Sequence, residues 1–438
     1  MYPNLYFFIK EVFGADLQGF KLVNSFGLLV AISFLAAAWA LSTELKRREK
    51  NGWLQSTETK IWVGKGANMS EVIWNAFFGF IAGWKFVGFF SEKEIAFQDP
   101  QAFLLSGNGN VGAGIALALF FAGLKWWAGS KTKLAKPEQR SIRIWPHDRV
   151  GDMTIFAAVF GFGGAKIFHN LENWDELVRD PVGSLLSFSG LTFYGGLICA
   201  GAAILWYAKK HKINRWHLVD AFGPALMIAY GVGRLGCQVS GDGDWGILNS
   251  AYVSTPEGKS VLATSTGFQD TVSAHLGYYQ RSFAGVNEIQ SFNDVMHTPV
   301  VAPSWLPTWM VAYSYPHNVI SEGIPNANCE GQWCNHLPVP VFPTPFYEAI
   351  MCIILFGVLW ALRKKLKIPG LLFGVYLILN GLERFMIERI RVNTTYHLGN
   401  FHPTQAQLIS SALVLVGVII ILLRRKQGQA LVESEKGL

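Results

Sequence analysis

Long apolar stretches separated by polar segments dominate the pattern of this 438-residue chain. A helix needs about 20 consecutive apolar residues to cross the hydrocarbon core of a bilayer. Nine stretches reach or approach this length, at residues 24–42, 71–90, 110–128, 152–168, 191–208, 218–237, 346–362, 370–388 and 404–423. The pattern therefore predicts an all-α polytopic membrane protein with about nine transmembrane helices.

The basic residues between these stretches alternate in number, and this alternation indicates how the predicted helices are oriented in the membrane. The segments that follow the first, third, fifth, seventh and ninth stretches carry 21 Lys and Arg, whereas the four alternate segments, which are longer in sum, carry 6. Cytoplasmic loops are enriched in Lys and Arg. The alternation predicts an N-terminus outside the cytoplasm and a cytoplasmic C-terminus.

One connecting segment differs in kind from the others. Residues 238–345 form a stretch of 108 residues rich in Gly, Ser, Asn, Pro and aromatic side chains, which we expect to be a large extracytoplasmic loop. It contains Cys329 and Cys334, and disulfides persist outside the cytoplasm. Their spacing leaves two alternatives open, a disulfide that closes a tight loop or two separate thiols.

Composition and charge narrow the class of protein further. Charged residues make up 15% of the chain, against roughly 25% in soluble domains, and 16 Trp with 32 Phe exclude a disordered chain. A net charge of +7 would favour nucleic acid as the partner of a soluble protein. Because these charges alternate between loops, we expect the bilayer as the partner and no nucleic acid.

Metal-binding and targeting motifs are missing from the sequence. No C-x-x-C pair occurs, so that zinc-ribbon and thioredoxin-like sites are not expected, and we expect neither a metal nor a cofactor. The N-terminal segment has no basic region before an apolar run, and we expect no removable signal peptide.

Ionisable residues inside the predicted spans are the first candidates for function, because charge at membrane depth is costly. They are Lys85, Lys166, Arg234, Glu348, Glu383, Arg384 and Glu388. The two lysines lie near helix ends, where a long side chain can also extend to the interface.

Two of the arginines favour an anion site. Arg234 lies among glycines, about one turn inside the outer end of its stretch, and Arg384, Glu388 and Arg391 have the spacing of one helical face. A structural ion pair at a helix end is the alternative. The planar guanidinium fork suits phosphate, and the phosphate most available at this depth belongs to a phospholipid. These residues therefore predict a protein that binds a lipid phosphate close to the large loop.

A third candidate element begins the fifth stretch. Tyr194 precedes Gly195 and Gly196 there. A tyrosine at this depth is often an interfacial anchor, whereas paired glycines indicate the close approach of a helix or a ligand.

Four motifs occur in the order FYGGL, GRLG with a Gly/Asp-rich continuation, PTPFYEA and GLERFMIERIR. Together they resemble the bacterial prolipoprotein diacylglyceryl transferases. The resemblance implies one integral membrane transferase domain over residues 1–438. Its parts are a first core helix at 24–42, an extra two-helix insertion at 69–128, core helices at 150–246, an extracytoplasmic loop insertion at 247–342 and C-terminal core helices at 343–425.

The resemblance also implies an activity and a location. Members of this family lie in the bacterial cytoplasmic (inner) membrane and transfer the diacylglyceryl group of phosphatidylglycerol to the lipobox cysteine thiol of a prolipoprotein signal peptide. The products are a thioether and glycerol-1-phosphate, in the first step of lipoprotein maturation. The alternative is a non-enzymatic transporter of lipids or small anions, although such proteins tend to contain clear internal repeats and this sequence shows only a weak one.

The residue roles follow from the same resemblance. The family's signature arginine corresponds to Arg234 and the essential arginine of its penultimate helix to Arg384, with Tyr194 and Glu388 as further catalytic candidates. The other expected site residues are Arg391, Gly195, Gly196, Gly236 and Asp242 at the lipid head group, and Glu348, Lys166 and Cys237 in support.

Four positions depart from the family pattern. Tyr194 stands where a histidine is usual, Cys237 where many members have asparagine, Lys166 where an arginine is usual, and Phe26 where a tyrosine is common. A phenol holds its proton more tightly than an imidazolium does. We therefore expect a hydrogen-bonding or positioning role for Tyr194 rather than proton abstraction.

Overall fold

In the computed structural model, the described residues are 1–92, 103–104, 106–186, 192–284, 286, 288–327, 329, 332–396 and 402–436. Most of them are helical. The chain divides into two compact units: the first contains residues 1–50 and 214–438, and the second contains residues 51–213.

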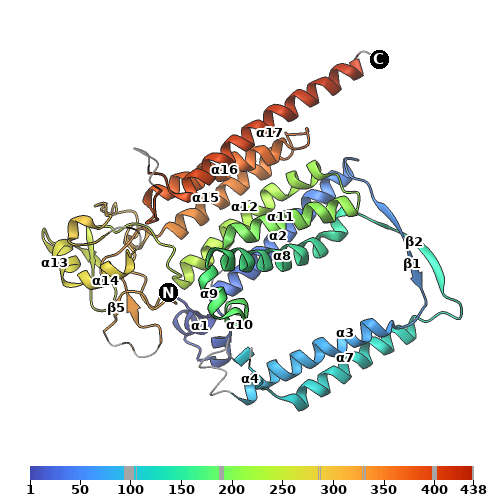
Figure 1. Cartoon of the computed structure of the whole chain (residues 1–438), viewed down its shortest axis with the longest axis horizontal. Helices are drawn as coiled ribbons and strands as arrows, with labels where there is room; N and C mark the ends of the chain where they lie inside the picture. Colours follow the sequence, from blue (N-terminus) through green and yellow to red (C-terminus); the bar gives the residue numbers. More distant parts are fainter. Residues whose placement is uncertain are drawn as a thin grey trace. The chain divides into compact units, whose positions relative to one another are not determined.

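Long helices that pack around α12 form the framework of the first unit (Figure 1). Its helices are α1 (Leu5–Phe13), α2 (Ser25–Lys50), α12 (Arg215–Ser240), α15 (Thr344–Leu362), α16 (Leu371–Ile387) and α17 (Gln405–Lys436). Helices α2 and α15 pack along α12, and α16 packs along α17. Small residues allow the close approach: a Cβ at Gly231 of α12 would lie 3.1 Å from the Cβ of Cys352 in α15.

A buried network of charges joins these helices at the C-terminal end of α2. Glu44 accepts a hydrogen bond from Arg48 at 2.8 Å and faces Arg363, the residue that directly follows α15, at 3.5 Å. Arg48 also faces Asp220 of α12 at 3.5 Å. Asp220 in turn accepts the backbone N–H of Gly370 at 2.8 Å, just before α16 begins. Because these charges are buried but paired, the network fixes four helices relative to one another.

The long segment between α12 and α15 folds into a small subdomain. Its elements are β3 (Tyr252–Ser254), β4 (Ser260–Leu262), α13 (Gly267–Ala274), α14 (Leu276–Ser282), β5 (Ile324–Pro325) and β6 (Asn335–His336). Strands β3 and β4 pair antiparallel, as do β5 and β6. The subdomain has a hydrophobic core that includes Leu248, Val272, Tyr279, Tyr315 and Val339. It is therefore a packed structure rather than an extended loop.

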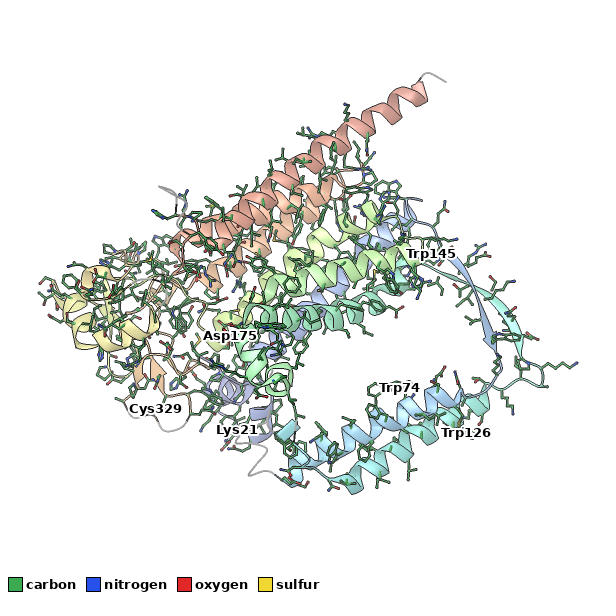
Figure 2. All side chains as sticks on the ribbon, viewed as in Figure 1. Lys21, Trp74, Trp126, Trp145, Asp175 and Cys329 are labelled. Atoms are coloured by element: carbon green, nitrogen blue, oxygen red, sulfur yellow. A yellow bond between two sulfur atoms is a disulfide. The ribbon has the colours of Figure 1, made fainter. Side chains whose placement is uncertain are left out.

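A disulfide joins Cys329 to Cys334 in this subdomain, and Figure 2 labels the first of them. The two Cα atoms lie 5.6 Å apart, a usual separation for bridged cysteines. Of the two alternatives that the spacing left open, the disulfide is confirmed.

Two helical hairpins and a β ribbon make up the second unit. Its elements are β1 (Thr57–Val63), α3 (Met69–Ile81), a π-helical segment (Ala82–Val87), α4 (Gly88–Ser91), α7 (Val111–Lys131), β2 (Glu138–Ile144), α8 (Val150–Glu172), α9 (Trp174–Arg179), α10 (Pro181–Leu186) and α11 (Phe193–Lys210). Helix α3 packs along α7, and α8 packs along α11. Strands β1 and β2 pair antiparallel over their whole length.

The hairpin of α3 and α7 has an aromatic and charged end. Trp74 of α3 and Trp126 of α7 both lie toward the end of the hairpin that joins the β ribbon (Figure 2). Glu71 and Lys125 form an ion pair of 2.6 Å at the same end. Exposed tryptophans at a helix end are typical of a membrane interface.

Lys85 does not extend to an interface, which was one of the two expectations. Its side chain is 7% exposed, and its ammonium group donates to the backbone carbonyls of Phe103 at 3.1 Å, Ser106 at 2.5 Å and Asn108 at 2.9 Å. The lysine therefore fixes the residues that precede α7.

Each of the nine predicted spans coincides with a helix or, at residues 69–91, with a continuous helical stretch. Seven of the described helices are long and apolar enough to cross a membrane. The other two are α16, which has 17 residues, and α11, which ends in Lys209 and Lys210. Residue 191, at which the fifth predicted span begins, lies outside the described residues.

The strands are a difference from the predicted all-α class. Besides the ribbon of the second unit, short strands occur in the subdomain of the first. The chain is thus mostly helical, with several helices that can cross a membrane, as expected for a polytopic membrane protein.

Candidate active site

Arg234 reaches the site from the last part of α12. Helix α12 ends at Ser240. Gly241, its C-cap, has a φ of +68° in the left-handed region, and Gly243 follows with φ +99°. Glycine adopts these conformations without the penalty that other residues incur. The two glycines turn the chain back toward α12, so that Asp244 forms an ion pair with Arg234.

Glu348 is the central residue of the site. It lies one turn inside α15, its side chain is fully buried, and it forms ion pairs with Arg234 at 2.6 Å, Arg384 at 2.8 Å and Arg391 at 3.7 Å. One carboxylate thus brings together guanidinium groups from distant parts of the chain. Glu348 was expected only in a supporting position.

The segment around Gly246 brings the parts of the site together. The N–H of Gly246 donates to Phe342 just before α15, and the N–H of Ile247 donates to Ile390 just after α16, each at 2.9 Å. A Cβ at Gly246 would lie 2.6 Å from the carbonyl oxygen of Ile390. Only glycine fits between these two backbones, and its position sets that of Asp244.

The backbone that carries Arg384, Glu388 and Arg391 differs from the predicted single helix. Helix α16 ends at Ile387, and Arg391 has extended backbone geometry. Arg384, Glu388 and Arg391 therefore do not share one helical face, and the prediction was wrong in this respect. The side chains nevertheless converge: Arg384 faces Glu388 at 3.2 Å, and Arg391 donates to Asp244 at 2.6 Å.

Asp244, rather than the expected Asp242, contacts the arginines. Burial raises the pKa of Asp244, but the guanidinium groups of Arg391 and Arg234 outweigh this effect and hold the pKa well below its usual range. Asp242 accepts a weak hydrogen bond from the N–H of Asp244 at 3.4 Å, and burial raises its pKa. Asp244 is therefore the anionic partner of the cluster.

Three further residues belong to the site. Tyr230 and Asn393 had no role in the sequence-based prediction, and Glu383 was named there only among the ionisable residues of the predicted spans. The ring centroid of Tyr230 lies 5.4 Å from the Cζ atom of Arg234, a cation–π distance. Glu383 is buried, and neither of its carboxyl oxygens has a hydrogen-bond partner among the described residues. Asn393 donates to Glu388 at 2.7 Å. Tyr230 lies one helical turn before Arg234, so the spacing in the sequence could have indicated that the two side chains lie on the same helical face.

The cluster retains capacity to bind an anion. Its three guanidinium groups and the carboxylates of Glu348, Asp244 and Glu388 balance in charge. A guanidinium carries five N–H donors, and Nε and Nη1 of Arg391 are buried without a hydrogen-bond partner among the described residues. Donors of this kind, fixed by ion pairs, suit the oxygens of a phosphate group.

Three potential metal ligands lie beside the cluster. One ligand atom each of Cys237, Asp242 and Asp244 lies within 4.8 Å of the others. However, Arg234 and Arg391 already bind the two carboxylate oxygens of Asp244. A cation would have to displace these guanidinium groups.

A cavity of about 370 Å³ adjoins the cluster within the first unit. Asp244, Arg391 and Asn393 line one part of it, and residues of the subdomain line the rest. Arg234 and Arg384, the two arginines of the predicted site, share the carboxylate of Glu348. Arg391 of the same cluster lines the cavity.

The expected glycines are helix-packing positions in the structure. A Cβ at Gly236 would lie 3.3 Å from side-chain atoms of Phe26 and Leu29 in α2. In the second unit, a Cβ at Gly195 would lie 2.4 Å from Phe168, and one at Gly196 would lie 2.8 Å from the carbonyl oxygen of Gly161 in α8. These contacts explain the need for glycine without a ligand.

The remaining expected residues fall in both units. Tyr194 is half-buried in the first turn of α11, and Lys166 is 6% exposed in α8, both in the second unit. Cys237 belongs to the first unit, where its Sγ lies 3.7 Å from Nη1 of Arg234.

Comparison with known proteins agrees with the motifs. The family model described as prolipoprotein diacylglyceryl transferase matches residues 111–423. The match begins at the first residues of α7, so that one helix of the predicted two-helix insertion falls inside it.

Several curated proteins are similar to the chain. A phosphatidylglycerol–prolipoprotein diacylglyceryl transferase of Staphylococcus haemolyticus is 24% identical over 66% of this chain and 78% of its own length. That of Enterococcus faecalis is 24% identical over 71% and 90%, and that of Dehalococcoides mccartyi is 25% identical over 76% and 96%. Since the family model matches well over half of the residues, the chain belongs to the prolipoprotein diacylglyceryl transferase family.

Proposed function

We propose that the protein transfers the diacylglyceryl group of phosphatidylglycerol to the lipobox cysteine thiol of prolipoproteins. Family membership and the names of the similar proteins support this activity. The observation that carries the proposal to particular residues is the convergence of Arg234, Arg384 and Arg391 on one buried carboxylate, Glu348.

The reaction needs stabilisation of a leaving phosphate. The acceptor thiolate attacks the glycerol carbon, a carbon–sulfur bond forms, and the carbon–oxygen bond to phosphate breaks. The electron pair of the broken bond stays on the phosphate oxygen, and glycerol-1-phosphate leaves as a monoester. Charge therefore develops next to the guanidinium groups, and prearranged cations lower the energy of such a transition state. Glu348 and Asp244 hold these cations in place before substrate arrives.

The placement in the cell is part of the same proposal. Because Lys and Arg alternate between the connecting segments, we assign nine spans, an outer N-terminus and a cytoplasmic C-terminus, in the bacterial inner membrane. Residues 1–438 then form one transferase domain, with insertions at 69–128 and 247–342. Tyr194 keeps its proposed positioning role and Lys166 its supporting role, whereas Gly195 and Gly196 pack α11 against α8.

The test uses the purified full chain, phosphatidylglycerol vesicles and a lipobox peptide, with thioether formation and glycerol phosphate release as readouts. Arg234→Ala and Arg384→Ala each remove donors to the leaving phosphate, and we expect transfer to fall on the order of 100-fold or more. Arg389→Ala is the matched control, because Arg389 is exposed at the end of the same helical region. It should transfer at the wild-type rate.

Folding must be separated from catalysis in this experiment. Arg234→Lys and Arg384→Lys keep the charge but lose the planar fork, and they should also transfer poorly while unfolding at a temperature near that of the wild type. Transfer near the wild-type rate by either alanine variant would contradict the assigned roles. A wild-type protein that binds phosphatidylglycerol and releases no glycerol phosphate would contradict the activity itself.

A further inference from the structure

The cavity beside the arginine cluster is formed mainly by the inserted subdomain. Its walls include the apolar side chains of Leu248, Phe283 and Ile320, and its polar lining includes Ser282 and Glu322 on the subdomain side. Asp244, Arg391 and Asn393 beside or in the arginine cluster also line it. A cavity of about 370 Å³ is at the lower end of the range for small-ligand pockets, roughly 300–1,000 Å³.

The cavity is built into a packed core. Leu248, Tyr279, Phe283 and Val339 line it and also belong to the hydrophobic core of the subdomain. Ser282 donates a hydrogen bond to Glu322 across two segments that lie 40 residues apart in the sequence. The walls are therefore fixed by packing before any ligand enters.

The lining disfavours a lipid as the occupant. An acyl chain requires an extended apolar surface, whereas the lining of this small cavity includes the polar side chains of Ser282, Glu322 and Asn393. A phosphate group inside this cavity would face the carboxylate of Glu322, which forms no ion pair among the described residues. A short polypeptide segment suits the lining better, since it combines backbone N–H and C=O groups with side chains of mixed polarity.

The reaction geometry specifies which segment. The thiol must attack beside the arginine cluster, and consecutive Cα atoms lie 3.8 Å apart. The residues adjoining the thiol must therefore pass next to Asp244 and Arg391, where the cavity begins. A signal peptide is N-terminal to the mature chain and apolar, so that its side of the thiol stays in the membrane and the other side continues outward.

We propose that this cavity binds the one or two residues that follow the acceptor cysteine, and that the subdomain between α12 and α15 thereby selects the polypeptide substrate. The inference rests on the proposed transferase function. Glu322 supplies a charge preference: acceptors with an amide or a basic side chain at this place are favoured over acceptors with an acidic one.

The experiment combines two cavity variants with two controls in the full chain. Ile320 lines the cavity and is 47% exposed, so that Ile320→Trp narrows the cavity. Val301→Trp introduces the same large side chain at an exposed position of the subdomain that does not line the cavity. Glu322→Gln removes the charge, and Glu288→Gln does so at an exposed position outside the lining. The probes are phosphatidylglycerol vesicles and lipobox peptides with Gly, Lys, Asp or Phe after the cysteine.

We expect Ile320→Trp to raise the KM for the Phe peptide about tenfold, and that for the Gly peptide much less, with the KM for phosphatidylglycerol unchanged. Glu322→Gln should reduce the preference for the Lys over the Asp peptide. Equal KM values for all four peptides in the wild type and both variants, or a raised KM for phosphatidylglycerol alone, would overturn the proposal.

A binding measurement separates this inference from the activity. The dissociation constant of a fluorescent Phe peptide is measured without phosphatidylglycerol, for the wild type, Ile320→Trp and Val301→Trp. Weaker binding by Ile320→Trp alone supports the cavity even if the wild type transfers no lipid, in which case only the transferase function fails. Equal binding by all three proteins overturns the cavity as the peptide site.

Discussion

Glu348 determines how the three arginines of the site are held. It is fully buried and is the shared partner of Arg234, Arg384 and Arg391. Removing one member of a buried ion pair is far more costly than removing an exposed one, because the remaining charge stays desolvated. The residue thus affects both the stability of the unit and the position of the phosphate-binding groups.

Glu348→Gln tests this dual role. We expect the free energy of unfolding to fall by about 3–5 kcal/mol and lipid transfer to fall on the order of 100-fold, measured by thermal unfolding in detergent and by thioether formation. Glu383→Gln is the matched control, because Glu383 is buried in the neighbouring helix and forms no ion pair among the described residues. Equal losses of stability and transfer in both variants would show that the ion pairs of Glu348 are not the cause of these losses.

Tyr194→Phe distinguishes a hydrogen bond from proton transfer. A single hydrogen bond contributes about 1 kcal/mol, so that we expect transfer to fall by roughly tenfold or less. Tyr396→Phe, at a tyrosine that is 48% exposed, is the control. Complete loss of transfer with intact folding would assign proton chemistry to the phenol and refute the positioning role.

The sequence allowed the charged residues of the site to be predicted because charge is rare inside apolar stretches. Arg234, Arg384 and Glu348 stand out for this reason. Asp244 could not be separated from Asp242 by sequence, since the choice depends on the turn made by Gly241 and Gly243. The central position of Glu348 follows from the crossing of α12, α15 and α16, which no local pattern encodes.

Among the elements, the strand-like segment at Gly246 controls the site most directly. It passes between the residue before α15 and the residues after α16, with no space for a side chain. Its conformation therefore transmits any change in those helices to Asp244.

Gly246→Ala tests this control. A Cβ there would overlap the carbonyl oxygen of Ile390 and the Cγ2 of Thr344, at 2.6 and 2.8 Å. We expect a loss of roughly 1–3 kcal/mol in stability from overpacking together with reduced transfer, measured by thermal unfolding and the peptide assay. Gly233→Ala in α12 has no neighbouring atom within 4 Å and should leave both unchanged. An unaffected Gly246→Ala protein would disprove the close approach.

The helices could be predicted and the strands could not, for one physical reason. Apolar length is a direct signal of a membrane helix. Strands β1 and β2 expose nearly all of their side chains, so that they bury no apolar face that an alternating pattern would reveal. The strands of the subdomain are two or three residues long, which is too short for any periodicity.

At the scale of the whole molecule, the topology is the main prediction that remains to be measured. The positive charges place residues 91–109 outside and residues 129–149 in the cytoplasm. Gly107→Cys and Thr132→Cys, each exposed and in a background without Cys199, Cys237 and Cys352, report on these two segments.

A membrane-impermeant maleimide should label the cysteine at position 107 in intact cells. It should label the cysteine at position 132 only after permeabilisation. The opposite pattern would invert the topology, and labelling of both in intact cells would remove one span between them.

The buried charges at the end of α2 constrain how the protein is made. A ribosome completes α2 long before α12, because residues 51–213 are translated in between, and domains generally fold in the order of synthesis. The nascent α2 thus carries Glu44 and Arg48 paired only with near neighbours until Asp220 and Arg363 emerge. The whole second unit has been translated by then. Arg234, Arg384 and Arg391, which we propose to bind the leaving phosphate, are therefore among the last groups to be brought together during biogenesis.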